Sequence, residues 1–182
     1  MESRFTSFVG GPMGPWKIVS IKAISGDGIT PASHLDLCEG LNEVEDAVWQ
    51  LRGVASNLRY TNEGERKALA SIQPGLGRAE ARCAALIPIR KTAAWWLLAQ
   101  DERRAIIEEQ SRHIAIGMAY LPAVARKLFH ARDLGEPFDF LTWFEFAPGD
   151  SAGFDSLLTA LRASPEWDYV DREVEIRLER VR

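Results

Sequence analysis

The chain has 182 residues, of which 46% are hydrophobic and 26% are charged, and its formal net charge is −4. This composition is typical of a globular protein and excludes a disordered or fibrous chain, while the length predicts a single structural unit. The acidic balance argues against a nucleic acid or an anionic membrane surface as a partner. Three histidines far apart in the chain and two cysteines outside any CxxC spacing argue against a structural zinc site.

Three sequence features bear on the compartment. No apolar run approaches the roughly 20 residues that are needed to span a bilayer. The first six residues, Met-Glu-Ser-Arg-Phe-Thr, lack the basic and apolar segments of a secretory signal, so we expect a cytoplasmic protein. Two isolated cysteines, Cys38 and Cys83, are typical of a reduced chain with structural cysteines, although the sequence leaves open one disulfide between them.

Glycines, prolines and alternating apolar residues set the expected elements of the first half. The glycine- and proline-rich residues 1–15 are expected to form an arm or loop, and residues 16–24 alternate like a half-buried strand. Residues 34–46 are acidic and are expected to be helical. Residues 48–54 alternate again and predict a strand, and a short apolar segment follows at 68–72.

The second half is predicted to contain, in order, a strand, a helix, two strands, a helix and a strand. These elements are expected at residues 82–89, 101–118, 126–131, 138–146, 151–163 and 173–178. This is the order of a ferredoxin-like antiparallel sheet with helices on one face. The first half resembles a shortened version of the same order. We therefore expect an α+β fold made of two such halves, residues 1–78 and 79–182, within one structural unit.

Two residues are the main candidates for chemistry. His113 lies on the apolar stripe of the predicted long helix, seven residues after Ile106, where a histidine is either a core residue or a ligand. A zinc or non-haem iron site needs two or three protein ligands, whereas a haem iron needs a single histidine. Arg126 opens a strand among apolar neighbours, where it can pair with an acid or bind a small anion at the mouth of a cavity.

Five aromatic residues could line a flat apolar cofactor. Adjacent tryptophans such as Trp95 and Trp96 usually fill a core, with one ring on each side of the chain. Together with Trp143, Phe144 and Phe146, they also provide enough apolar surface to wall a porphyrin.

Three further polar residues have no distinctive pattern of their own. Lys91 is typical of a strand-end charge, Glu166 of an exposed helix end, and Gln73 of a turn before proline. The sequence contains no nucleophile elbow and no phosphate-binding loop, and the Gly75-Leu-Gly77 segment lacks the remaining glycines of a dinucleotide site.

Several segments in combination resemble the chlorite dismutase family. The resemblance extends over residues 80–180, more loosely before them, and no single motif carries it. The matching segments are Ile89-Arg-Lys-Thr-Ala-Ala-Trp-Trp96, Ser111-Arg-His-Ile114, Ala119-Tyr-Leu-Pro122, Ala125-Arg-Lys-Leu-Phe-His130 and Phe138-Asp-Phe-Leu-Thr-Trp-Phe-Glu145. Trp143 departs from the family, because many members have tyrosine at this place.

The resemblance implies a dimeric α+β barrel with haem b in the half formed by residues 79–182. It implies that His113 is the proximal iron ligand and that Arg126 is the distal, catalytic arginine. The other residues that it assigns to the haem site are Lys91 and Glu166 as hydrogen-bonding partners around the histidine, Gln73 as the partner of the arginine, Trp95 and Trp96 beside the haem, and Asn57 and Tyr60 as propionate contacts.

The activity implied by the resemblance is conversion of chlorite, a small anion, to chloride and dioxygen, with a role in detoxification. The shortened first half is similar to the short form of the family, which predicts a homodimer. Coproheme decarboxylase is an alternative within the same superfamily, but its members tend to lack the arginine found here as Arg126. A non-enzymatic haem-binding or haem-sensing protein and a cofactor-free barrel remain alternatives from other classes.

Overall fold

The computed structural model describes residues 4–55, 63–64, 67 and 75–181. Eight strands in these residues form a closed barrel with the neighbour order β1-β3-β2-β8-β5-β7-β6-β4. All the pairings are antiparallel. The strands are β1 (Phe5–Gly11), β2 (Trp16–Ser25), β3 (His34–Glu39), β4 (Trp49–Ala55), β5 (Cys83–Lys91), β6 (Ala125–His130), β7 (Phe140–Phe146) and β8 (Val170–Arg180).

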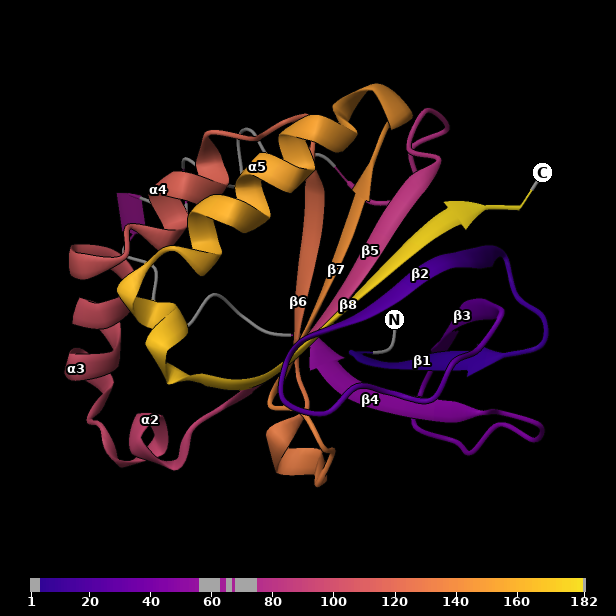
Figure 1. Ribbon diagram of the computed structural model, residues 1–182, viewed down its shortest axis with the longest axis horizontal. Helices are drawn as coiled ribbons and strands as arrows, with labels where there is room; N and C mark the ends of the chain where they lie inside the picture. Colours follow the sequence, from indigo (N-terminus) through magenta and orange to yellow (C-terminus); the bar gives the residue numbers. More distant parts are fainter. Residues whose placement is uncertain (1–3, 56–62, 65–66, 68–74, 182) are drawn as a thin grey trace.

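Helices cover the outer face of the barrel on the side of the later strands, as Figure 1 shows. They are α2 (Ala93–Leu97), α3 (Gln100–Arg104), the π-helix η1 (Ala105–Gln110), α4 (His113–Met118), α5 (Ser151–Arg162) and the short 3-10 segments η2 (Arg132–Leu134), η3 (Pro148–Asp150) and η4 (Pro165–Tyr169). Among the residues described, no helix is both long and apolar enough to cross a membrane.

The strand alternation divides the core into two layers. On β7, Leu141 and Trp143 face the barrel interior, while Phe144 and Phe146 face outward and pack under α5. Strand β5 alternates in the same way, because Leu86 belongs to the interior cluster and its neighbours in sequence belong to the outer one. Both faces of these strands are buried, which explains their almost continuous apolar sequences.

The two halves of the chain pair their strands in the same order. Strands β1 to β4 lie in the order β4-β1-β3-β2, and strands β5 to β8 lie in the order β8-β5-β7-β6. In each half the fourth strand pairs with the first, the first with the third, and the third with the second. The pairings β2 with β8 and β4 with β6 join the halves into one barrel.

Most predicted strands and the helix at 151–163 are confirmed, but two predictions in the first half are wrong. Residues 1–15 contain strand β1 rather than only a loop, and its glycine Gly10 lies directly under the ring of Trp49. Residues 34–46 contain strand β3 rather than a helix. Leu35 points into the barrel and is fully buried, while the acidic residues of this strand stay partly exposed. In this segment, the alternation of buried and exposed side chains therefore predicts the structure better than the acidic composition does.

The predicted helix at 101–118 is interrupted. It divides into α3, η1 and α4, and Arg112 adopts the left-handed conformation with φ = 53° just before α4. The backbone N–H of Ser111 bonds to the carbonyl of Ile106, five residues earlier, which is the spacing of a π-helix. The break sets the start of α4 at His113 and so fixes where the histidine lies.

Candidate functional site

Three side chains from distant parts of the sequence meet at the start of α4. His113 Nδ1 lies 2.6 Å from Oε2 of Glu166, which belongs to η4. Nζ of Lys91, at the end of β5, donates to the other carboxylate oxygen, Oε1, over 2.8 Å. Glu166 thus holds an ammonium group with one oxygen and the imidazole with the other, and none of the described residues occupies Nε2 of His113.

The carboxylate of this cluster stays ionised. The side chains of Lys91 and Glu166 are buried, with exposed fractions of 4% and 8%. Burial alone would raise the pKa of Glu166, but the charges and hydrogen bonds of His113 and Lys91 outweigh it and lower this pKa to about 2. An ionised carboxylate can only accept, so the proton of the 2.6 Å bond lies on His113 Nδ1.

Main-chain contacts of neighbouring side chains hold the cluster in place. Ser111 Oγ accepts a hydrogen bond of 2.8 Å from the backbone N–H of Glu166 and so ties η4 to the segment before α4. The carboxylate of Glu108 accepts from the backbone N–H of Ile114 at the first turn of α4. The histidine is therefore fixed through its own side chain and through the backbone on both sides.

Arg126 reaches the same helix from the sheet. It lies on β6 opposite Phe144 of β7, on the outer face that the helices cover. Its guanidinium lies against Gly117, because a Cβ built at position 117 would be 3.0 Å from Cζ and would overlap Nη1. Burial lowers the pKa of Arg126 below its usual value, and the negative charge of Glu108 opposes this shift. The guanidinium of Arg126 thus lies beside α4 at Gly117, one helical turn after His113.

Trp95 is buried beside the cluster and has an unused hydrogen-bond donor. The ammonium group of Lys91 lies 4.5 Å from the centre of its ring, and the ring of Tyr169 meets it edge-on at 5.5 Å. Its Nε1 is buried and has no hydrogen-bond partner among the residues that the structure describes. Leaving such a group unpaired is costly, so this indole N–H fits an acceptor on a bound molecule.

Trp96 lies in a polar cluster and is only half-buried. Its Nε1 donates to Oδ2 of Asp139 over 3.2 Å, and its ring stacks on Phe140. The guanidinium groups of Arg132 and Arg103 lie 3.9 and 5.1 Å from its ring centre. The two tryptophans thus have different surroundings, as expected for adjacent positions on a helix.

The predicted site is brought together only in part. Trp143 faces the barrel interior, so it does not share a wall with Phe144 and Phe146, and the expectation that these aromatic residues line one surface is wrong. The alternation of a strand is the reason, because neighbouring side chains point to opposite faces. The predicted residues Asn57, Tyr60 and Gln73 and the segment 68–72 lie outside the described residues.

Sequence reasoning missed several residues that shape the site. Gly117 and Trp167 contact the predicted residues Arg126 and His113, and Ser111 and Glu108 hold the backbone around the histidine. Gly117 follows His113 by four residues, which places it on the same helical face, so helical spacing could have identified it. The contacts of Ser111 with Glu166 and of Trp167 with His113 join separate segments and left no pattern in the sequence.

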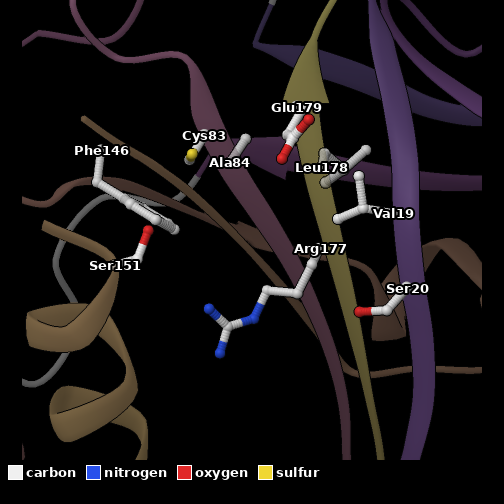
Figure 2. Close-up of a pocket in the computed structure, with 9 residues that line it drawn as sticks. All are labelled: Val19, Ser20, Cys83, Ala84, Phe146, Ser151, Arg177, Leu178 and Glu179. Atoms are coloured by element: carbon white, nitrogen blue, oxygen red, sulfur yellow. The ribbon is translucent and has the colours of Figure 1, made fainter. Parts of the chain in front are cut away.

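A pocket away from this cluster includes one residue of the predicted aromatic wall, Phe146, and none of the other predicted site residues. It lies between β2, β8, β5 and the start of α5, with a volume of about 220 Å³ (Figure 2). Its lining residues are Val19, Ser20, Cys83, Ala84, Phe146, Ser151, Arg177, Leu178 and Glu179. Arg177 is paired with Glu175 and Asp155, and burial raises the pKa of the Cys83 thiol. The pocket therefore presents neither a free cation nor an activated thiol.

Within the described residues, no three His, Cys, Asp or Glu side chains are grouped so that they could hold a metal ion. Both cysteines are free thiols, so the disulfide that the sequence left open is not formed. A metal bound by protein side chains alone is thus not supported by this part of the chain. A metal inside a cofactor needs a single protein ligand, and His113 can provide one.

Comparisons with known proteins identify relatives of the chain. The family model described as chlorite dismutase matches residues 36–180. The chlorite dismutase of Ideonella dechloratans is 31% identical over 126 residues, which cover 68% of this chain. The match spans 42% of that relative, so the chain corresponds to less than half of its length.

Solved structures agree with this result. The dimeric chlorite dismutase from Nitrobacter winogradskyi is 55% identical, with a TM-score of 0.91, and the match covers 97% of this chain and 99% of that one. A mutant chlorite dismutase from Candidatus Nitrospira defluvii is 20% identical, with a TM-score of 0.66 and coverage of 100% and 93%. At that identity the likeness shows the fold alone.

Proposed function

The chain belongs to the chlorite dismutase family, and from this premise we propose that it is a haem b enzyme that converts chlorite to chloride and dioxygen. The observation that carries the proposal is the contact of His113 with the buried, ionised Glu166, which leaves Nε2 of the imidazole available. The 55% identity to the chlorite dismutase from Nitrobacter winogradskyi supports the same activity.

The residues present fit a haem group. His113 would hold the iron through Nε2, and the buried, unpaired Nε1 of Trp95 would donate to an acceptor such as a carboxylate of the porphyrin. Trp96, Asn57 and Tyr60 are proposed as further contacts of the cofactor. When bound, haem iron supplies the redox chemistry that breaks the Cl–O bonds of chlorite.

Glu166 and Lys91 would act on the histidine. The carboxylate keeps the proton of the imidazole on Nδ1, so that the lone pair of Nε2 points to the iron, and its negative charge makes the imidazole a stronger donor. Lys91 compensates the buried negative charge through the 2.8 Å ion pair. This tuning of a ligand by a hydrogen-bonded carboxylate needs no further protein ligand.

Arg126 would bind the substrate. A guanidinium in partly buried surroundings attracts a small oxyanion strongly and orients it through two donors. We propose that it holds chlorite, and then its chlorine-containing fragment, in place during the reaction, with Gln73 as its hydrogen-bonding partner. No general base is needed, because the reaction transfers no proton from the substrate.

The topology supports two ferredoxin-like halves, residues 1–78 and 79–182. The second half has the strand and helix order predicted for this fold, and both halves pair their strands in the same sequence of neighbours. We also propose a homodimer, because the protein from Nitrobacter winogradskyi, which matches nearly the whole chain, is described as dimeric. Light scattering tests this, and a pentamer would contradict it.

Oxygen evolution tests the proposed activity. Purified protein loaded with haem should show a Soret band and release dioxygen when chlorite is added, and His113→Ala should lose the native haem spectrum. A Soret band without dioxygen release would favour haem binding or sensing, and decarboxylation of coproheme would favour the alternative enzyme. Arg126→Ala should bind haem but release less dioxygen and leak hypochlorite, and unchanged turnover would contradict its role.

A further inference from the structure

We infer that Trp167 is a positioning residue that sets the plane of the His113 imidazole. The two rings stack with their centres 6.4 Å apart and their planes 23° apart. The inference rests on the proposed haem ligation by His113, and it adds a second constraint on the ligand besides the pair formed by Glu166 and Lys91.

The hydrogen bond to Glu166 restrains this plane only in part. Rotation about the Cβ–Cγ bond moves Nδ1, so the bond limits this rotation, but coupled changes of χ1 and χ2 can still tilt the ring while Nδ1 stays on the carboxylate. Stacking on a flat neighbour narrows this freedom, because a tilt of the imidazole moves it away from the nearly parallel plane of the indole. The side chain of His113 is 29% exposed in the part of the chain that the structure describes, so its open edge is not held by close packing there.

The indole is itself held firmly. Its Nε1 donates to Oε2 of Glu173 over 2.8 Å, and Glu173 is 1% exposed. The other oxygen of this carboxylate accepts two bonds from Arg162, of 2.9 and 2.6 Å. Each acceptor atom of Glu173 is thus used, one for Trp167 and one for Arg162. The chain of contacts anchors the indole to β8 and α5.

The neighbouring residue strengthens the coupling. Glu166 and Trp167 are adjacent in η4, so the acceptor of the Nδ1 proton and the surface under the ring move as one unit. Ser111 ties the backbone of Glu166 to the segment that leads into α4. The ammonium of Lys91, which pairs with Glu166, also lies 5.6 Å from the centre of the Trp167 ring. His113 is therefore oriented by two side chains of one short segment.

Glu173→Gln is the most selective perturbation. An amide has one acceptor oxygen, so at this position its NH₂ group must face the donor of either Trp167 or Arg162. Glu175→Gln is the matched control. Glu175 is also buried and also uses both oxygens, for Arg162 and Arg177, but it does not contact the indole. Both substitutions weaken the same ionic network, but only Glu173→Gln makes Trp167 and Arg162 compete for one acceptor oxygen and so loosens the anchor of the indole.

Trp167→Leu removes the stacking surface, and Trp167→Phe keeps a ring but loses the anchoring bond. Trp49→Phe is the control for loss of an indole, because Trp49 Nε1 bonds to the carbonyl of Thr30 in the first half. In the haem-free protein, NMR should show the ring protons of His113 shifted by the indole ring current. This shift should vanish in Trp167→Leu and shrink in Trp167→Phe and Glu173→Gln.

In the haem-loaded protein, resonance Raman spectra of the ferrous state should show a changed iron–histidine stretch in the Trp167 and Glu173 variants. Haem should dissociate on the order of ten-fold faster from Trp167→Leu, while Trp49→Phe and Glu175→Gln should match the unmodified protein. Unchanged His113 NMR shifts and an unchanged iron–histidine stretch in Trp167→Leu would overturn the inference and leave haem ligation by His113 intact. If the unmodified, haem-loaded protein showed no iron–histidine stretch at all, the proposed function would be overturned instead.

Discussion

Replacing Gly117 with alanine should displace the guanidinium of Arg126 and leave the fold intact. A Cβ at position 117 would overlap Nη1 and would lie 3.0 Å from Cζ and 3.1 Å from Nη2. Nonbonded carbon atoms settle at about 3.5–4.0 Å, so the guanidinium must move on the order of 1 Å. A misplacement of this size at a reacting centre can lower the rate about 100-fold.

Stability should not fall, because the atoms that must move belong to the end of a flexible side chain. Alanine is also favoured over glycine inside a helix by up to about 1 kcal/mol. Gly153 in α5 is the matched control, since a Cβ there meets no described heavy atom within 4 Å. We expect both variants to melt up to about 2–4 °C higher than the unmodified chain.

The assay compares oxygen evolution from chlorite in the haem-loaded variants with their melting temperatures. Gly117→Ala should lose most of its activity at normal stability, and Gly153→Ala should keep its activity. Full activity in Gly117→Ala would show that the place of Arg126 beside this glycine does not matter for catalysis. A melting temperature well below that of the control would show that the side chain cannot give way.

Three further predictions concern the ionisable groups. The pKa of Glu166 is lowered from 4.5 to about 2 on folding. Its ionisation therefore stabilises the fold by roughly 3 kcal/mol above pH 4.5, and this contribution is lost as the pH falls toward 2. The free energy of urea unfolding of Glu166→Gln should lack this pH dependence. Lys91→Met leaves the carboxylate of Glu166 without its ammonium partner and should lower the free energy of unfolding by roughly 3 kcal/mol. A loss below about 0.5 kcal/mol would contradict a buried ion pair. Burial raises the pKa of the Cys38 and Cys83 thiols, so both should react with iodoacetamide at pH 7 more slowly than free cysteine, and equal rates would contradict this.

Apolar patterns predicted strands of two kinds: β2 alternates and has one exposed face, whereas β5 is apolar almost throughout and is buried on both faces. Residues 16–24, 48–54 and 82–89 correspond to β2, β4 and β5 with bounds shifted by one or two residues. Strand β1 escaped because Gly10 and Gly11 are typical of turns, whereas here Gly10 makes room for the ring of Trp49. That requirement comes from a neighbouring strand, and nothing in the local sequence indicates it.

The site could be predicted through the family resemblance but not through patterns in the chain alone. Helical periodicity placed His113 on an apolar stripe, yet the helix breaks at Arg112 and the histidine begins a new one. Glu166 looked like an exposed helix end, and only the tertiary structure buries it against Lys91. A buried ion pair between residues 75 positions apart leaves no local signal.

The short helix that carries the histidine depends on side chains for its order. A helix of six residues such as α4 is not stable by itself, because nucleation costs more than so few hydrogen bonds return. Its first turn is held instead by the carboxylate of Glu108, by Ser111 through Glu166, and by the hydrogen bond that His113 donates to Glu166. The position of a ligand on such a helix is therefore set by the surrounding segments, so that a change in η4 should move the ligand even where α4 itself is unaltered.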